Sequence, residues 1–202
     1  MIPKTPPLTI ALVAISIGVY LLMTFGNIQA VIGPLLISEY VRPTLPEIAN
    51  GQLWRLVTPL FLHFGIFHIT FNMLWTWELG RIIEWRQGPL VLGVLTLVSG
   101  IAANLAQYFV SGPLFGGMSG VIFAYLGYVW TQERTNPRFG IRINPAILKL
   151  MLGWFLICWT GILEKLFGLS VANTAHTAGL VAGILVGLVV SGISRFANTA
   201  RR

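Results

Sequence analysis

Long apolar runs recur along this chain, and they constrain its fold more than any other feature. Runs of about 20 mostly apolar residues are long enough to cross a bilayer, and only short polar segments separate them. Of the 202 residues, 55% are hydrophobic and 9% are charged, whereas a soluble domain carries about 25% charged residues. Because so few charges cannot cover a soluble surface, the sequence predicts an all-α membrane protein with a single domain over residues 1–202.

Turn signals divide the apolar sequence into segments. Gly-Pro and Asn-Pro pairs, which favour turns, stand at 88–89, 112–113, 136–137 and 144–145. They predict a bundle of six transmembrane helices. The expected spans are 8–25, 63–83, 89–110, 119–132, 145–163 and 173–193.

Two of these segments have an unusual length. The fourth helix, at about 1.5 Å per residue, reaches only about 21 Å of the roughly 30 Å hydrocarbon layer, so we expect it to begin inside the membrane. The first connection, 26–62, is long yet partly apolar. We expect it to form short amphipathic helices at the membrane interface, with Tyr40 and Trp54 at the level of the lipid headgroups.

The net charge of +7 reflects topology rather than nucleic-acid binding. The basic residues stand in short loops and at the ends of the chain, and no dense block of them exists beyond Arg201 and Arg202. With the N-terminus in the cytoplasm, ten of the 13 Lys and Arg residues fall on the cytoplasmic side. The other three are Arg42, Arg55 and Lys165. Basic residues concentrate in cytoplasmic loops, so we expect both termini in the cytoplasm.

Polar groups inside a membrane are costly, so their positions are informative. Ser119, His176 and the set His63, His68 and Asn72 all fall near the extracytoplasmic ends of expected helices. Each residue alone has an ordinary explanation, such as a serine bonded to the preceding helical turn or a histidine that packs in a core. Their shared level is the feature that favours a common site.

Small residues offer a way to bring two of these helices together. Gly179, Gly183 and Gly187 form one stripe after His176, and Gly120 and Ala124 form another after Ser119. Small residues four apart allow close helix packing in membranes. If the stripes face each other, Ser119 and His176 come to one level, although the stripes alone would indicate only close packing.

These motifs resemble the rhomboid intramembrane proteases, in particular bacterial forms with six helices. Four elements occur in order at family-like spacing between about 50 and 190. They are Trp54-Arg55, His63 with His68-x-x-x-Asn72, Gly117-Met118-Ser119-Gly120, and Ala175-His176-x-x-Gly179-x-x-x-Gly183.

The resemblance implies a role for each matched residue. Ser119 would be the nucleophile and His176 the general base, while His68, Asn72 and the backbone N–H of Ser119 would form the oxyanion site. The remaining matches would support the structure: Trp54, Arg55, His63, Glu84, Gly117, Gly120, Gly179 and Gly183. Bacterial relatives often have a tyrosine four residues after the serine, which stacks on the histidine, but here Phe123 keeps the ring without the hydroxyl.

The reaction chemistry follows from the residues available. The chain has no Asp, and none of its glutamates lies in the expected fourth or sixth span at the level of His176. We therefore expect a Ser-His dyad, in a polar cavity that Asn173 also lines, rather than a triad. No cofactor is implied. The chain has no H-E-x-x-H motif, so the sequence does not indicate a metal site.

The predicted partners are the lipid bilayer and single-pass transmembrane proteins, which would be cleaved near their extracytoplasmic ends. The small loops and modest size suggest a bacterial inner membrane. Two alternatives remain. A catalytically silent relative that binds membrane clients would usually have lost Ser119 or His176, and a transporter would show paired short helices in two related halves, whereas only one short helix is found.

Overall fold

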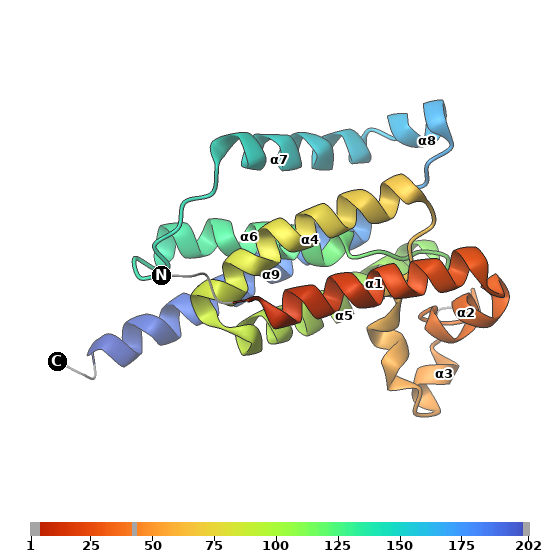
Figure 1. Cartoon of the computed structure of the whole chain (residues 1–202), viewed down its shortest axis with the longest axis horizontal. Coiled ribbons are helices and arrows are strands. Elements are labelled where there is room, and N and C mark those ends of the chain that lie inside the picture. Colours follow the sequence, from red (N-terminus) through yellow and green to blue (C-terminus); the bar gives the residue numbers. More distant parts are fainter. Residues whose placement is uncertain (1–4, 42–43, 200–202) are drawn as a thin grey trace.

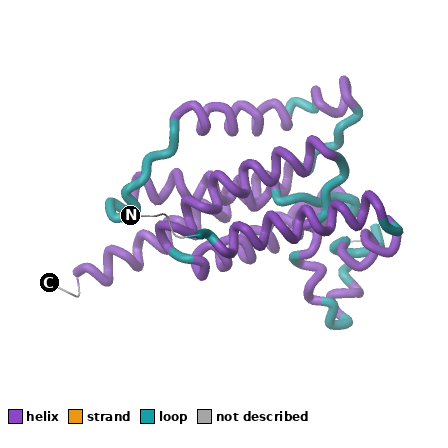
Figure 2. Tube along the Cα trace, viewed as in Figure 1, coloured by secondary structure: helices purple, strands orange, loops and turns teal. Residues whose placement is uncertain are grey.

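The computed structural model describes residues 5–41 and 44–199, in which every regular element is a helix (Figures 1 and 2). The α-helices are α1 (Pro7–Phe25), α2 (Ile28–Leu35), α3 (Pro46–Ala49), α4 (Ile66–Gln87), α5 (Pro89–Ser111), α6 (Ser119–Thr135), α7 (Pro145–Trp159), α8 (Ile162–Phe167) and α9 (Asn173–Thr199). Two short 3₁₀ helices, η1 (Leu53–Leu56) and η2 (Thr58–Phe61), precede α4.

Within the described residues, three helices are long and apolar enough to cross a membrane: α1, α5 and the Asn173–Ser194 part of α9. The chain is therefore an integral membrane protein with apolar helices. Among the remaining helices, α4 carries several charges, and α6 and α7 have only 17 and 15 residues.

The helix ends follow local chemistry. Proline, which has no N–H to lose at a helix start, opens α1, α5 and α7, and the side chain of Asn144 accepts a hydrogen bond from the N–H of Ala146 at the start of α7. Gly88 (φ 88°) and Gly112 (φ 79°) follow α4 and α5 in a backbone region that favours glycine.

The helix α6 forms the centre of the bundle, since twelve of its 17 residues are buried, Tyr125 and Tyr128 completely. The helix α9 packs directly on its backbone. A Cβ at Gly179 would collide with the carbonyl oxygen of Gly120, and a Cβ at Gly183 with that of Ala124. Two helices can lie this close only without side chains between them.

Glu84 of α4 attaches α1 to the bundle. Its carboxylate accepts hydrogen bonds from the N–H groups of Leu8 and Thr9 at 2.8 Å and from the Thr9 hydroxyl at 2.7 Å. These N–H groups have no partner within their own helix, so the carboxylate caps α1 and also complements its dipole.

The long first connection folds into α2, α3, η1 and η2, so it does contain short helices. Arg55 lies buried at its centre, where it donates to the carbonyls of Gly33 and Leu36 and pairs with Glu39 at 3.0 Å. Trp54 and Tyr40 are both more than half exposed.

The expected helix over 145–163 ends earlier, at Trp159. The chain turns at Thr160 and Gly161, whose φ of 69° interrupts the helix, and α8 follows as a separate element. Of α7, only Met151 and Cys158 are buried, and Figure 1 shows α7 set apart from α4.

The connections are sorted between two ends of the bundle. The start of α1, the α4–α5 turn, the α6–α7 connection and the end of α9 lie at one end, and α2, α3 and α8 at the other (Figure 1). This arrangement suits the predicted topology. Four of its basic residues, Lys4, Arg42, Arg201 and Arg202, lie outside the described residues.

Candidate active site

Ser119 and His176, which are 57 positions apart in sequence, meet where α6 begins. The Nε2 atom of His176 lies 2.9 Å from Ser119 Oγ. His176 is 4% exposed, and Ser119 is partly exposed. This distance allows the hydroxyl to donate its proton to Nε2 when that nitrogen is unprotonated.

The other ring nitrogen of His176 is isolated. Its Nδ1 atom is buried and has no hydrogen-bond partner. In a triad a carboxylate would occupy this position. The geometry therefore fits a serine–histidine pair and provides no third member.

The ring of Phe123 supports the imidazole from the next turn of α6. The two ring centroids are 4.8 Å apart, and the planes are inclined by 45°, so the contact is tilted rather than stacked in parallel. Phe155 of α7 in turn contacts Phe123 edge-on, with centroids 5.3 Å apart. The position of the imidazole is thus coupled through Phe123 to α7.

Two side chains fix the first turn of α9, just before His176. Gln107 of α5 accepts a hydrogen bond from the N–H of Ala175 at 3.1 Å. Asn173 donates to the carbonyl of Cys158 in α7 at 3.0 Å, while its Oδ1 atom has no partner. Asn173 therefore attaches α9 to α7, and its place in a polar cavity stays a prediction.

The loop before Ser119 lies against His68. Gly117 has a φ of 112°, and a Cβ there would come within 2.6 Å of His68 Nε2. The N–H of Gly117 donates to the carbonyl of Pro59 at 2.9 Å. His68 is thus at the same level as the start of α6, with Nε2 directed toward the loop.

Asn72 and His63 complete this group of polar side chains. The amide of Asn72 donates to the carbonyl of His68 at 2.8 Å, and its buried Oδ1 atom has no partner. The ring of His63 is 5.0 Å from that of His68 and contacts the carbonyl of Phe61 through Nδ1. Its buried Nε2 atom is also unpartnered.

The start of α6 itself provides hydrogen-bond donors. The first hydrogen bond within this region runs from the N–H of Ile122 to the carbonyl of Met118. The N–H groups of Ser119, Gly120 and Val121 belong to the first helical turn, where such groups have no intrahelical acceptor. They carry the positive end of the helix dipole, which favours an anion.

Three of the residues singled out in the sequence lie away from this pair. Glu84 binds the start of α1, and Trp54 donates to the carbonyl of Pro34 beside the buried Arg55.

Gln107 was not among the candidates, although a polar residue in an apolar span is a recognisable signal. In the described part of the chain, no three His, Cys, Asp or Glu residues are arranged to hold a metal ion.

Comparison with known proteins relates the chain to one family. The model of the rhomboid domain matches residues 50–193. The chain is 37% identical over 184 residues to Rhomboid protease GlpG of Yersinia pseudotuberculosis, which covers 89% of the chain and 61% of that relative. It is 38% identical over 183 residues to the protein of the same name from Serratia proteamaculans. That match covers 91% of the chain and 62% of the relative. The chain thus spans about three fifths of the length of these relatives.

Proposed function

The chain belongs to the rhomboid family, and on this basis we propose that it is an intramembrane serine endopeptidase. Ser119 is the nucleophile and His176 its general base. The observation that carries this proposal is the 2.9 Å contact between Ser119 Oγ and His176 Nε2 in a chain homologous to rhomboid proteases.

A serine hydroxyl becomes an effective nucleophile when a neighbouring base accepts its proton. In the proposed reaction, Ser119 Oγ attacks the substrate carbonyl while its proton moves to His176 Nε2. The protonated imidazole then donates that proton to the leaving amine, and water repeats the sequence to release the acyl group. Phe123 restrains the imidazole in both half-reactions.

The tetrahedral intermediates place a negative charge on the former carbonyl oxygen. The proposed donors to this oxyanion are His68, Asn72 and the backbone N–H of Ser119 at the start of α6. The loss of one such donor typically costs about 2.7–4 kcal/mol of transition-state stabilisation. The second N–H of the Asn72 amide remains for this role, because only one is needed for the bond to the His68 carbonyl.

For the membrane arrangement we propose six spans, formed by α1, α4, α5, α6, α7 and α9. At about 1.5 Å per residue, the 17 residues of α6 extend about 25 Å, so Ser119 lies below the extracytoplasmic surface. Both termini are cytoplasmic, and the membrane is a bacterial inner membrane.

The proposed substrates are single transmembrane helices that enter from the lipid and unwind near their extracytoplasmic ends. The helix α7 supports lateral entry, since it buries only Met151 and Cys158 against the rest of the protein. Unwinding is required because a peptide bond within a helix is protected by the i to i−4 hydrogen bonds around it.

The experiment compares cleavage of a model transmembrane substrate by the purified protein, Ser119→Ala and His176→Ala. Ser99→Ala is the matched control, because this buried serine bonds only the carbonyl of Leu95 in its own helix. We expect both dyad variants to lose at least about 10³-fold in kcat and the control to retain activity.

A serine-directed phosphonate should label the unmodified protein and not Ser119→Ala. If the unmodified protein cleaves no substrate and Ser119 remains unlabelled, the chain is instead a catalytically silent, client-binding relative.

A further inference from the structure

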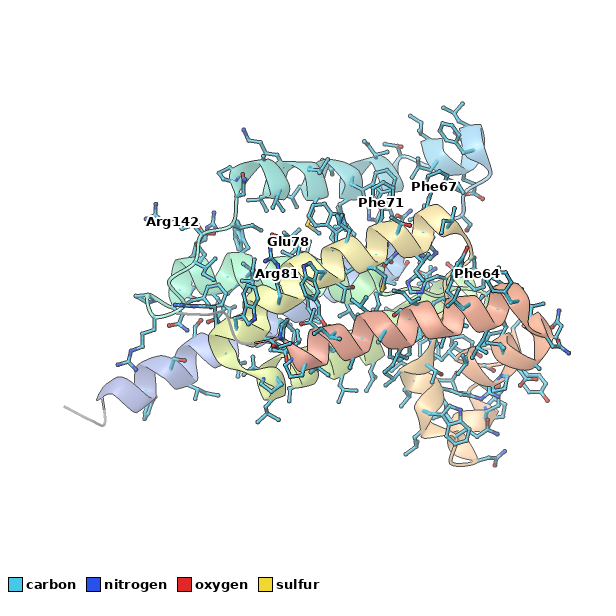
Figure 3. All side chains as sticks on the ribbon, viewed as in Figure 1. Phe64, Phe67, Phe71, Glu78, Arg81 and Arg142 are labelled. Carbon is cyan, nitrogen blue, oxygen red and sulfur yellow. The ribbon has the colours of Figure 1, made fainter. Side chains whose placement is uncertain are left out.

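The helix α4 has an outer and an inner face of different composition. Phe67 and Phe71 are exposed on the outer face, and Figure 3 shows Phe67, Phe71, Glu78 and Arg81 following one another along α4. The inner face carries a buried series in which the members are four residues apart, a spacing that places side chains on one side of a helix. Its members are Asn72, Thr76, Gly80 and Glu84. A polar series therefore runs inside the bundle from the candidate active site to the contact of Glu84 with α1.

The amide of Asn72 is satisfied at one end only. Its Nδ2 atom donates to the carbonyl of His68, and its buried Oδ1 atom has no hydrogen-bond partner. A single hydrogen bond leaves the amide free to turn about that bond. A donor at Oδ1 would fix the plane of the amide and with it the direction of the second N–H, which is the proposed oxyanion donor.

Thr76, one turn farther along the same face, carries a hydroxyl without a partner. The residue is completely buried, and its Oγ1 atom makes no hydrogen bond. Other buried hydroxyls donate to the carbonyl four residues earlier, as those of Ser99 and Thr131 do. Within the described residues, Thr76 is the one buried serine or threonine whose hydroxyl has no partner. Since an unpaired polar group in a core is costly, this exception calls for a ligand.

One water molecule would satisfy both atoms. Residues four apart on a helix have Cβ atoms about 5–6 Å apart, and a helical side chain leans back over the preceding turn. A water that bridges two oxygens spans a similar distance, about 5.6 Å, with two hydrogen bonds of about 2.8 Å. It would accept from the Thr76 hydroxyl and donate to Asn72 Oδ1, and buried waters commonly make two to four such bonds.

The nearby hydroxyl of Tyr125 does not provide this donor. The ring of Tyr125 comes within 3.5 Å of a Cβ placed on Gly80, the next member of the inner series. The Thr96 hydroxyl gives its hydrogen to the carbonyl of Leu92 at 2.7 Å, so in its 2.6 Å contact with Tyr125 the tyrosine is the donor. The Tyr125 hydrogen is thus already used, and Oδ1 of Asn72 still needs a donor.

We propose that one buried water binds between Asn72 Oδ1 and Thr76 Oγ1 and holds the Asn72 amide in the orientation that the oxyanion requires. Thr76 is then a positioning residue, which acts through the water and the amide without touching the substrate. This inference rests on the proposed protease function, because Asn72 is an oxyanion donor only in that reaction.

The water site is tested by crystal structures of the unmodified protein and of Thr76→Val. Valine has the shape of threonine without the hydroxyl. We expect density for one water within about 3 Å of both oxygens in the unmodified protein and none at this place in the variant. A direct bond between the hydroxyl and Oδ1, or no density between them, would overturn the inference. This measurement needs no activity.

The positioning role is tested by kinetics with a model transmembrane substrate. We expect Thr76→Val to lower kcat about five- to twenty-fold with little change in KM, because the oxyanion forms only in the reaction. This loss is smaller than the roughly 10²- to 10³-fold loss on removal of a donor itself. Thr76→Ser keeps the hydroxyl and should recover most of the kcat. Thr131→Val is the matched control, because this buried hydroxyl bonds only the carbonyl of Gly127 in its own helix.

A double variant shows whether Thr76 acts through the amide. Thr76→Val added to Asn72→Ala should cause no further loss of kcat. Losses that multiply, or an unchanged kcat in Thr76→Val alone, would overturn the positioning role. If the unmodified protein cleaves no substrate while its crystals contain the water, the proposed function and the positioning role fail together, and the water site stands.

Discussion

At the scale of single residues, the environment of His176 determines what the site can do. The imidazole contacts Ser119 through Nε2 and Phe123 through its face, and its buried Nδ1 has no partner. In a triad, the carboxylate fixes the tautomer and stabilises the imidazolium. Here only the contact with Ser119 and packing against Phe123 hold the ring, and we expect a slower hydrolase than a soluble serine protease.

The ring of Phe123 should therefore matter more than a hydroxyl on it. We expect Phe123→Tyr to change kcat by no more than about three-fold. Phe123→Ala should lower kcat by at least about ten-fold and should also destabilise the protein by about 3–5 kcal/mol through the cavity it leaves. Phe123→Leu tests the explanation, because leucine fills most of the space without a ring. Its kcat should lie between those of Phe123→Tyr and Phe123→Ala.

Gln107 should act on the site through the backbone of α9. Gln107→Leu leaves the Ala175 N–H without an acceptor, and such a buried unpaired group costs about 1–3 kcal/mol. We expect lower thermal stability and a lower kcat. Gln107→Glu keeps an acceptor oxygen and should recover most of the kcat. An equal loss of kcat in both variants would contradict this role.

At the scale of elements, the glycines of α9 set the distance between the side chains of Ser119 and His176. Gly179 and Gly183 allow its backbone to touch that of α6, so a change in helix separation directly changes the distance between Ser119 and His176. We therefore expect stability and activity to be coupled at this interface.

Alanine substitutions along α9 test this coupling. Gly179→Ala and Gly183→Ala force a Cβ onto a backbone carbonyl, and overpacking of this kind costs about 1–3 kcal/mol or more. We expect loss of both cleavage and thermal stability. Gly192→Ala is the control in the same helix, since no atom lies within 4 Å of its added Cβ. It should be neutral or stabilise the helix by up to about 1 kcal/mol.

We expect the connection between α1 and α4 to have its own pH dependence. Burial raises the pKa of the Glu47 carboxyl, but hydrogen bonds from the Glu39 N–H and the Ser38 hydroxyl, together with Arg55, lower it below the ordinary value. Because the folded pKa is the lower one, the stabilisation is complete above a pH of about 4.5 and is lost as pH falls toward the folded pKa.

Glu47→Gln should remove this dependence. We expect the unmodified protein to lose protection of the first connection against limited proteolysis below pH about 4.5. The variant should be cut more readily than the unmodified protein at neutral pH, with little further change on acidification. The same acid response in both proteins would assign it to another group.

At the scale of the whole molecule, the order of the connections fits a chain with both termini on one side. The connection that contains α2 and α3 lies at the end of the bundle where α6 begins, and the α6–α7 connection lies at the opposite end (Figure 1). The single cysteine, Cys158, is buried, so a background without cysteine is available by one substitution.

Topology can be measured in that background. With Cys158→Ser, a membrane-impermeant maleimide should label Tyr40→Cys in intact cells and should label Arg138→Cys only after the inner membrane is opened. Labelling of Arg138→Cys in intact cells, or protection of Tyr40→Cys, would reverse the proposed orientation.

The sequence by itself determined the class of the protein and most helix boundaries. Apolar length, proline at helix starts and glycine at turns act locally, so the helices at 7–25, 89–111 and from 119 could be expected from residues alone. The four spaced motifs likewise indicated the family, and Ser119 and His176 as its candidate pair.

Only the tertiary structure decided how these residues meet. The 2.9 Å contact of Ser119 and His176, the hydrogen bond from Ala175 to Gln107, and the cap that Glu84 provides for α1 all join residues from different helices. The break after Trp159 was also missed, because the apolar pattern continues through the turn at Gly161. Such contacts depend on the rotation and depth of each helix, which the packing of the whole bundle sets and which no local pattern encodes.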